Sequence, residues 1–285
     1  MTIQWYPGHM AKARRQVQEK IKQIDVVIEV ADARAPLASR NPLVDEMTSS
    51  KPRLMILNKA DLADPEYNRL WADYFEKKGD AVILADAQKG KGIREIPVKV
   101  KELAEPLLAK WARKGIRPRS IRALIIGIPN SGKSTVINRL AGKRITKIGD
   151  KPGVTKAQQW IKLNKELDLL DTPGILWPKF EDPNVGQMLA LTGAIKEEIF
   201  DYDESADYLL RFLGEHYQTL LMKRYQLETI PEKIEDLYDQ IGHKRGILIA
   251  GGRIDYERVS ELIFRDFRNG HFGRITLEFP PKTSG

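Results

Sequence analysis

The chain has 285 residues, 42% of them hydrophobic, no cysteine and a formal net charge of +8. Without cysteine it forms neither disulfides nor thiolate metal sites. No apolar stretch of about 18 residues marks a membrane span or a signal peptide, so we expect a soluble, cytoplasmic protein with no membrane partner. Its length is enough for two domains of ordinary size.

The charge is divided unevenly along the chain. Residues 181–285 contain 13 basic and 19 acidic residues, whereas residues 1–180 contain 34 and 20. The basic residues gather in three places, at 12–22, 89–122 and 143–165. Any one cluster is consistent with a solvated surface, but three in the same part of the chain favour a polyanionic partner, most plausibly nucleic acid.

The first 180 residues alternate between short apolar runs and amphipathic segments. Strands are expected at 25–32, 53–58, 81–86 and 122–127, and helices at 10–23, 67–79 and 96–115, with Pro106 a candidate break in the last helix. A further helix is expected to begin at Lys133, and residues 159–164 and 166–171 read as a hairpin-joined pair. This alternation predicts a doubly wound α/β domain, with a mostly parallel sheet and helices on both faces.

From about residue 179 the pattern becomes helical. Four segments have helical periodicity, and only 246–250 and 274–279 read as short extended runs. We therefore expect two domains, an α/β domain over residues 1–178 and a smaller, mainly α-helical domain over residues 179–285.

The stretch "GIPNSGKS" has the spacing of a phosphate loop. Gly127 is followed after four residues by Gly132, Lys133 and Ser134, between an expected strand and an expected helix. Glycines allow backbone N–H groups to close on phosphate oxygens at a helix N-terminus. Lys133 would reach the β- and γ-phosphates, and Ser134 would bind Mg²⁺.

The stretch "LLDTPG" begins about forty residues after the phosphate-loop lysine. It places Asp171 at a strand end, where an aspartate holds Mg²⁺ through water in phosphate-loop enzymes, and Gly174 where its N–H can sense a γ-phosphate. Between the two motifs, "PGVT" supplies Thr155 in a glycine-containing loop, a candidate to complete the Mg²⁺ shell.

The stretch "LNKADL" contains the pattern N-K-x-D at the carboxyl end of an expected strand. The carboxylate of Asp61 would accept hydrogen bonds from the N1 and N2 donors of guanine, a pair that adenine cannot offer. Asn58 would serve N7 and bridge to the phosphate loop, and the stem of Lys59 would cover the base. The next strand ends in "ADAQ", where the backbone N–H of Asp86 or Ala87 would meet guanine O6.

These motifs are those of a GTPase, in an unusual order. The guanine-reading motif precedes the phosphate loop, and the helix at 96–115 could join the natural ends of the sheet. The chain thus resembles the circularly permuted GTPases. "WYPGHMAKA", "VVIEVADARAPLASRNP", "LNKADL", "GIPNSGKSTVIN", "DTPGILWP" and "GGRIDYERVSELIFRDFRNGHFGRITLE" resemble the ribosome biogenesis GTPase A family over its whole length.

The resemblance implies GTP hydrolysis to GDP, coupled to late assembly of the large ribosomal subunit, with ribosomal RNA and ribosomal proteins as partners. It also implies Mg²⁺ as a cofactor and K⁺ near Asn130, because related GTPases with asparagine there use K⁺. Ile175 stands where many GTPases carry a water-orienting glutamine, which isoleucine cannot replace. His9, the one histidine in the first 178 residues, has a near-neutral pKa and could orient the attacking water instead.

The expected site has three groups of residues. Residues expected to bind GTP are Asn58, Lys59, Ala60, Asp61, Asp86, Ala87, Asn130, Ser131, Gly132, Lys133, Ser134, Thr135 and Gly174. Residues expected to act in catalysis are His9, Lys133 and Thr155; those expected to hold Mg²⁺ are Ser134, Thr155 and Asp171.

Three alternatives remain open at this point. A phosphate-loop kinase would lack N-K-x-D and usually carries an arginine-rich lid. A nucleotide-gated RNA-binding module that does not hydrolyse GTP is consistent with Ile175. A translation factor or a tRNA-modifying GTPase would share the nucleotide motifs but bind a different partner.

Overall fold

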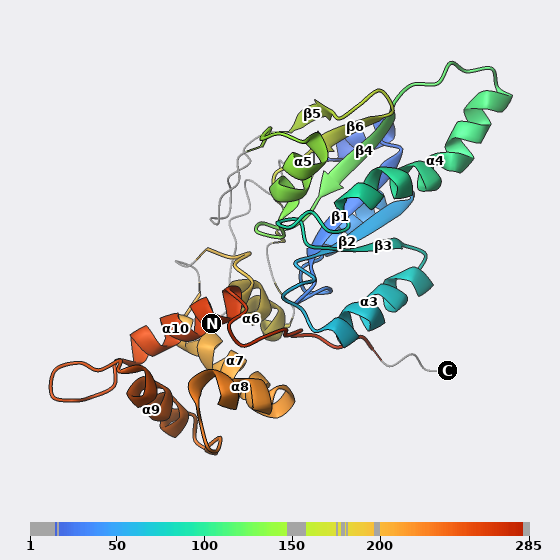
Figure 1. Cartoon of the computed structure of the whole chain (residues 1–285). Helices are drawn as coiled ribbons and strands as arrows, with labels where there is room; N and C mark the ends of the chain where they lie inside the picture. Colours follow the sequence, from blue (N-terminus) through green and yellow to red (C-terminus); the bar gives the residue numbers. More distant parts are fainter. Residues whose placement is uncertain are drawn as a thin grey trace.

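The computed structural model describes residues 15, 17–146, 158–174, 176–177, 180, 182–196 and 200–281. Its centre is a six-stranded sheet with the strand order β3-β2-β1-β4-β6-β5, in which β5 at one edge is antiparallel and the rest are parallel (Figure 1). The strands are β1 (Val26–Asp32), β2 (Arg53–Asn58), β3 (Ala81–Ala85), β4 (Ile121–Ile126), β5 (Gln159–Lys162) and β6 (Leu167–Asp171). The predicted mostly parallel sheet is confirmed.

Helices cover both faces of the sheet, as predicted. On one face, α4 (Ile96–Arg113) and α5 (Lys133–Ala141) pack on alternate residues of β1, β2, β4 and β6. On the other, α3 (Pro65–Lys77) packs through Trp71 and Phe75 on β2, while α2 (Pro42–Thr48) and Val17 pack on β1 and β4. Strands β1, β2 and β4 are almost entirely buried because both of their faces are covered.

Three expected helix boundaries differ from the structure. Helix α3 begins two residues early, because the Asp64 side chain accepts a hydrogen bond from Glu66 N and Pro65 occupies the first turn. Helix α4 continues through Pro106, so the candidate break is absent. Of the helix expected at 10–23, residues 10–14 and 16 lie outside the described residues, residues 15 and 17–20 are helical, and a 3₁₀ turn, η1 (Ile21–Gln23), follows.

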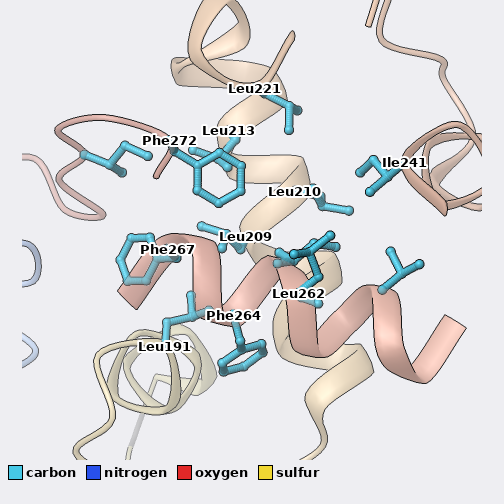
Figure 2. Packing of buried hydrophobic residues seen from close by; sticks show 14 of the residues in the cluster. Leu191, Leu209, Leu210, Leu213, Leu221, Ile241, Leu262, Phe264, Phe267 and Phe272 are labelled. Carbon is cyan, nitrogen blue, oxygen red and sulfur yellow. The ribbon is translucent and has the colours of Figure 1, made fainter. Parts of the chain in front are cut away.

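The helical part forms a second hydrophobic core. It contains α6 (Pro183–Leu191), α7 (Tyr202–His216), α8 (Gln218–Tyr225), α9 (Ile234–Arg245) and α10 (Tyr256–Arg268). Figure 2 shows Phe264 and Phe267 of α10 among Leu191 of α6 and leucines of α7. An isolated bridge joins Leu248 to Ile254, where a short extended run was expected. The mainly helical character of this part is confirmed, while the predicted boundary at 178 and 179 lies outside the described residues.

The C-terminal segment returns from α10 to the sheet part and lies beside α3 (Figure 1). Ile275 N donates to Leu62 O, Leu277 N donates to Arg34 O, and the carboxylate of Glu278 accepts from the backbone N–H groups of Leu37 and Ala38. The expected extended run at 274–279 is therefore a strap that joins the two parts of the chain. None of the helices in the described residues has the length and apolarity needed to cross a bilayer.

Candidate functional site

The carboxyl ends of five strands meet at one edge of the sheet. Asp32 of β1 lies opposite Asn58 of β2, Asn58 lies opposite Ala85 of β3, and Ile125 of β4 lies opposite Asp171 of β6. The N-K-x-D, phosphate-loop and D-T-P-G motifs all follow these ends directly. The structure thus brings together motifs that the sequence separates by more than a hundred residues, at the edge where open α/β sheets bind ligands.

The candidate phosphate loop turns sharply from β4 into α5. Asn130 and Gly132 have left-handed backbone conformations, with φ of 58° and 92°. A Cβ atom on Gly132 would lie 2.1 Å from Nδ2 of Asn58, so glycine is required there for steric as well as conformational reasons. Lys133, Ser134 and Thr135 then form the first turn of α5, whose N–H groups lack intrahelical partners. This geometry suits an anion.

Lys133 and Asp171 form a buried ion pair at the centre of the site. The distance from Lys133 Nζ to Asp171 Oδ1 is 2.6 Å, and both side chains are buried. Burial lowers the pKa of Lys133, and the charge of Asp171 opposes that shift. The second carboxylate oxygen, Asp171 Oδ2, is buried without a hydrogen-bond partner in the described residues. An oxygen of this kind fits a hydrated Mg²⁺, which prefers oxygen ligands and keeps several waters.

Asn58 joins the candidate base loop to the candidate phosphate loop. Its Nδ2 donates to Ser131 O at 2.9 Å, and its Oδ1 accepts from Ala87 N at 3.1 Å. The predicted bridge from Asn58 to the phosphate loop is therefore present. Because the side chain is buried, both of these hydrogen bonds are shielded from water.

The two backbone groups predicted to meet guanine O6 have internal partners. Asp86 N donates to Lys91 O, and Ala87 N donates to Asn58 as described above. Their N–H groups are therefore not available for O6 in this arrangement. The next amide, Gln88 N, makes no hydrogen bond to any described residue.

The carboxylate of Asp61 lies at the surface beside a lysine. Lys89 Nζ is 3.3 Å from Asp61 Oδ2 and 3.4 Å from Asp86 Oδ2. Hydrogen bonding to Asp61 raises the pKa of Lys89. A ligand that donates two hydrogens to Asp61 would compete with this exposed contact, which stabilises the pair only weakly because water screens it.

The helical part contacts the phosphate loop directly. Asn130 Nδ2 donates to the carbonyl oxygen of Gly193, just beyond α6, at 2.5 Å. Arg268 of α10 donates to the carbonyl oxygens of Ala190 and Leu191 at the end of the same helix. On the sheet side, a Cβ atom on Gly174 would lie 2.8 Å from Pro129 N, so the D-T-P-G segment also packs on the loop.

Three residues singled out in the sequence lie outside the described residues. They are His9, Thr155 and Ile175. Their expected roles in orienting water and completing the Mg²⁺ shell stay predictions.

Comparisons with known proteins agree with the geometry. Over 280 residues the chain is 58% identical to Ribosome biogenesis GTPase A of Bacillus cereus, which covers 98% of this chain and 95% of that protein. The chain belongs to the ribosome biogenesis GTPase A family. The family member of Thermotoga maritima is 34% identical over 98% of this chain. The family model described as a 50S ribosome-binding GTPase matches residues 122–244.

Solved structures of the family share the fold. A GDP-bound structure of TM YlqF has a TM-score of 0.67 and 30% identity, covering 93% of this chain and 99% of that chain. A GNP-bound YlqF from T. maritima has a TM-score of 0.65 and 31% identity. Together with the family match, this confirms a GTP-binding GTPase with a permuted α/β domain and a helical C-terminal part.

Motif analysis missed several residues that complete the ribosome biogenesis GTPase A site. Within the quoted "DARAP" stretch, the carboxylate of Asp32 accepts hydrogen bonds from both Arg34 and Lys59, and the Gly193 carbonyl accepts one from the phosphate-loop asparagine. The position of Asp32 at a strand end could have indicated a role at this edge. Gly193 gives no such signal, because its contact depends on how the helical part packs.

Proposed function

We propose that the protein binds the large ribosomal subunit or its precursor and promotes its late assembly, hydrolysing GTP to GDP and phosphate. The observation that carries the proposal is the 2.9 Å hydrogen bond from Asn58 to Ser131 O, because it joins a guanine-reading motif to a phosphate loop. The printed descriptions of the family model and of the relatives support the ribosomal part. The basic character of residues 1–180 supports a partner that contains ribosomal RNA as well as ribosomal proteins.

We propose that the loop from Asn130 to Thr135 cradles the phosphates, with Lys133 leaving Asp171 to contact the β- and γ-phosphates. Ser134, Thr155 and Asp171 would hold Mg²⁺, which supplies positive charge to the phosphates. Gly174 would sense the γ-phosphate through its N–H. The amide oxygen of Asn130 would face K⁺, because its nitrogen already donates to Gly193.

The base would be read by Asp61, with Asn58 and Lys59 on either side and Ala60 in the same turn. We assign the O6 contact to Gln88 N in place of Asp86 N or Ala87 N, since these two amides have internal partners. His9 would orient the attacking water, because Ile175 has no polar atom with which to do so. We also propose that the GTPase domain ends at residue 178 and that the helical domain begins at residue 179.

Co-sedimentation with separated ribosomal subunits tests the proposal. With a non-hydrolysable GTP analogue, the full chain should pellet with the large subunit and not with the small one, and GDP should weaken this binding. GTP turnover should rise when large subunits are added. Binding without any turnover would favour a nucleotide-gated RNA-binding module, and equal binding to both subunits would favour a translation factor. Since ribosomes assemble in the cytoplasm of bacteria such as those of the relatives, we place its action there.

A further inference from the structure

A buried ionic cluster lies next to the candidate base loop, residues 58–61. The carboxylate of Asp32, the last residue of β1, forms ion pairs with both Arg34 and Lys59. Arg34 donates to Oδ1 from both its backbone N and its Nε, each at 3.0 Å, and to Oδ2 from Nη2 at 2.8 Å. Lys59 Nζ also donates to Oδ2, at 2.8 Å. The lysine of N-K-x-D is therefore held by an aspartate that lies outside the motif.

Arg34 fixes the orientation of this carboxylate. Three donors from one residue engage both oxygens, which leaves the Asp32 side chain a single rotamer that satisfies them all. Arginine suits this task because its donors form a rigid planar fork, whereas a lysine offers a mobile point charge. Burial alone would raise the pKa of Asp32, but the charges of Arg34 and Lys59 hold it far below its ordinary value. The carboxylate therefore stays ionised and aimed at Lys59.

Lys59 needs such support because its backbone is strained. Its φ is 60°, in the left-handed region that side chains other than glycine rarely occupy. Residues in this region persist when the surrounding structure holds them. Here Leu62 N donates to Lys59 O, and the ion pair with Asp32 anchors the far end of the side chain. The stem between these two anchors is the part expected to cover guanine.

The helical part holds Arg34 from its other side. The Arg34 guanidinium carbon lies 4.9 Å from the ring centroid of Phe267, which is buried near the end of α10 (Figure 2). Leu277 N of the strap donates to Arg34 O at 2.7 Å. The remaining nitrogen, Arg34 Nη1, is buried without a hydrogen-bond partner in the described residues, so the aromatic ring is a principal contact of that end of the guanidinium.

We propose that Arg34 is a positioning residue for the guanine base, acting through Asp32 and Lys59, and that Phe267 of the helical part sets its position. The inference rests on the proposed guanine site at residues 58–61. It adds a route by which a partner of the helical part controls how long the nucleotide stays bound. A shift of α10 loosens Arg34, then the carboxylate of Asp32, and then the lysine stem over the base.

The rate at which a fluorescent GDP leaves the full chain tests this route. Arg34→Met should speed dissociation about tenfold, as expected for losing a charge-assisted hydrogen-bond network. Arg34→Lys, which keeps the charge and loses the fork, should fall between the wild type and Arg34→Met. Wild-type dissociation in Arg34→Met would overturn the proposal.

Arg53→Met is the matched control. Arg53 is also buried and bonded to two carboxylates, Glu29 and Asp45, but it has no contact with the base loop. The control should lower thermal stability while leaving GDP dissociation unchanged. If both variants speed dissociation equally, the effect reflects loss of stability, and the positioning role of Arg34 is rejected.

Double variants separate action through Lys59 from a general effect. Lys59→Met should speed dissociation, and adding Arg34→Met should speed it no further, because both changes break the same chain of contacts. Independent, multiplied effects would contradict the proposal.

Phe267→Leu keeps an apolar side chain and should speed dissociation about threefold in the wild-type background but not beside Arg34→Met. This variant keeps the test decisive even if Arg34→Met does not fold.

A parallel Asp61→Asn variant distinguishes failure of this inference from failure of the guanine site. If Asp61→Asn exchanges GTP for XTP binding and the Arg34 variant dissociates GDP normally, the site stands and the positioning role falls. If Asp61→Asn leaves GTP affinity unchanged, the guanine site itself is misassigned.

Discussion

Lys133 Nζ lies 2.6 Å from Asp171 Oδ1, and both groups are buried. In the proposed site Lys133 would contact phosphate and Asp171 would hold Mg²⁺, so nucleotide binding would exchange this ion pair for those contacts. The two buried charges balance each other, so loss of the pair should have separate effects on stability and on binding.

Lys133→Met should destabilise the nucleotide-free protein by about 3–5 kcal/mol, because it leaves the Asp171 carboxylate buried and unpaired. The double variant Lys133→Met/Asp171→Leu should recover most of that stability, since it replaces both charges with apolar groups. Urea unfolding measures the first effect. Neither variant should bind GTP, and a double variant that remained as unstable as the single one would show that the pair is not what stabilises this site.

Asp61→Asn should weaken GTP binding and create XTP binding. The change turns a paired acceptor edge into one donor and one acceptor, which xanthine matches and guanine does not. Competition titrations with GTP and XTP measure the exchange. Lys89→Met is a useful control, because it removes the exposed partner of Asp61 and keeps the carboxylate; it should retain the preference for GTP.

Turnover should be faster in K⁺ than in Na⁺ at equal ionic strength, if the oxygen of Asn130 faces the ion. Asn130→Ala should remove the difference between the two salts and also release the Gly193 carbonyl. Gly193→Ala tests the second contact alone: its φ is 80° and an added Cβ would lie 3.3 Å from Asn130 Nδ2, so it should disturb the asparagine while keeping its oxygen. Equal turnover of the wild type in both salts would argue against a potassium site.

His9→Ala should keep nucleotide affinity and lose most of the hydrolysis that large subunits stimulate, while the basal rate changes less. The physical reason is that the subunit would order this histidine beside the attacking water. His216→Ala is the control, since that histidine packs on Phe212 and Phe279 in the helical part. A His9→Ala protein that bound subunits and was stimulated normally would exclude the catalytic role.

Glu278 should make stability depend on pH between about 4.5 and 7. Burial raises the pKa of Glu278 to about 7, and the charge of Asp182 raises it further. The hydrogen bonds from the N–H groups of Leu37 and Ala38 lower the pKa, but they do not cancel the effect of burial. The folded state then holds a proton that the unfolded state releases, so stability falls as pH rises through this window. Thermal melting from pH 4.5 to 8 should show this fall in the wild type and a flatter profile in Glu278→Gln.

The strands and the three nucleotide motifs could be predicted from sequence because each is a local pattern. Buried strands are continuous apolar runs, and strand ends place Asn58 and Asp171 at one edge. The continuity of α4 was harder to predict, because proline usually breaks a helix. Pro106 is exposed, so water can solvate the carbonyl group that loses its hydrogen bond, and the helix tolerates the ring.

The remaining parts of the site depend on distant packing. Arg34 and Phe267 are more than two hundred positions apart, and no periodicity connects them. Asn130 and Gly193 are 63 positions apart, and no periodicity connects them either. The internal partners of Asp86 N and Ala87 N also depend on tertiary geometry, since they follow from the turn at 86–91 and from the Asn58 rotamer.

The strand order also has a consequence for how the chain folds during synthesis. Val26 of β1 pairs with Ala123 of β4, so the centre of the sheet closes only after nearly a hundred intervening residues have been made. Until then β1 can pair with β2 but not with β4, and an unpaired apolar strand edge favours aggregation. Leu277 N also donates to Arg34 O, more than two hundred positions earlier in the chain. Non-local closure of this kind slows folding, and we expect the nascent chain to depend on chaperones more than a GTPase whose ladder forms in sequence order.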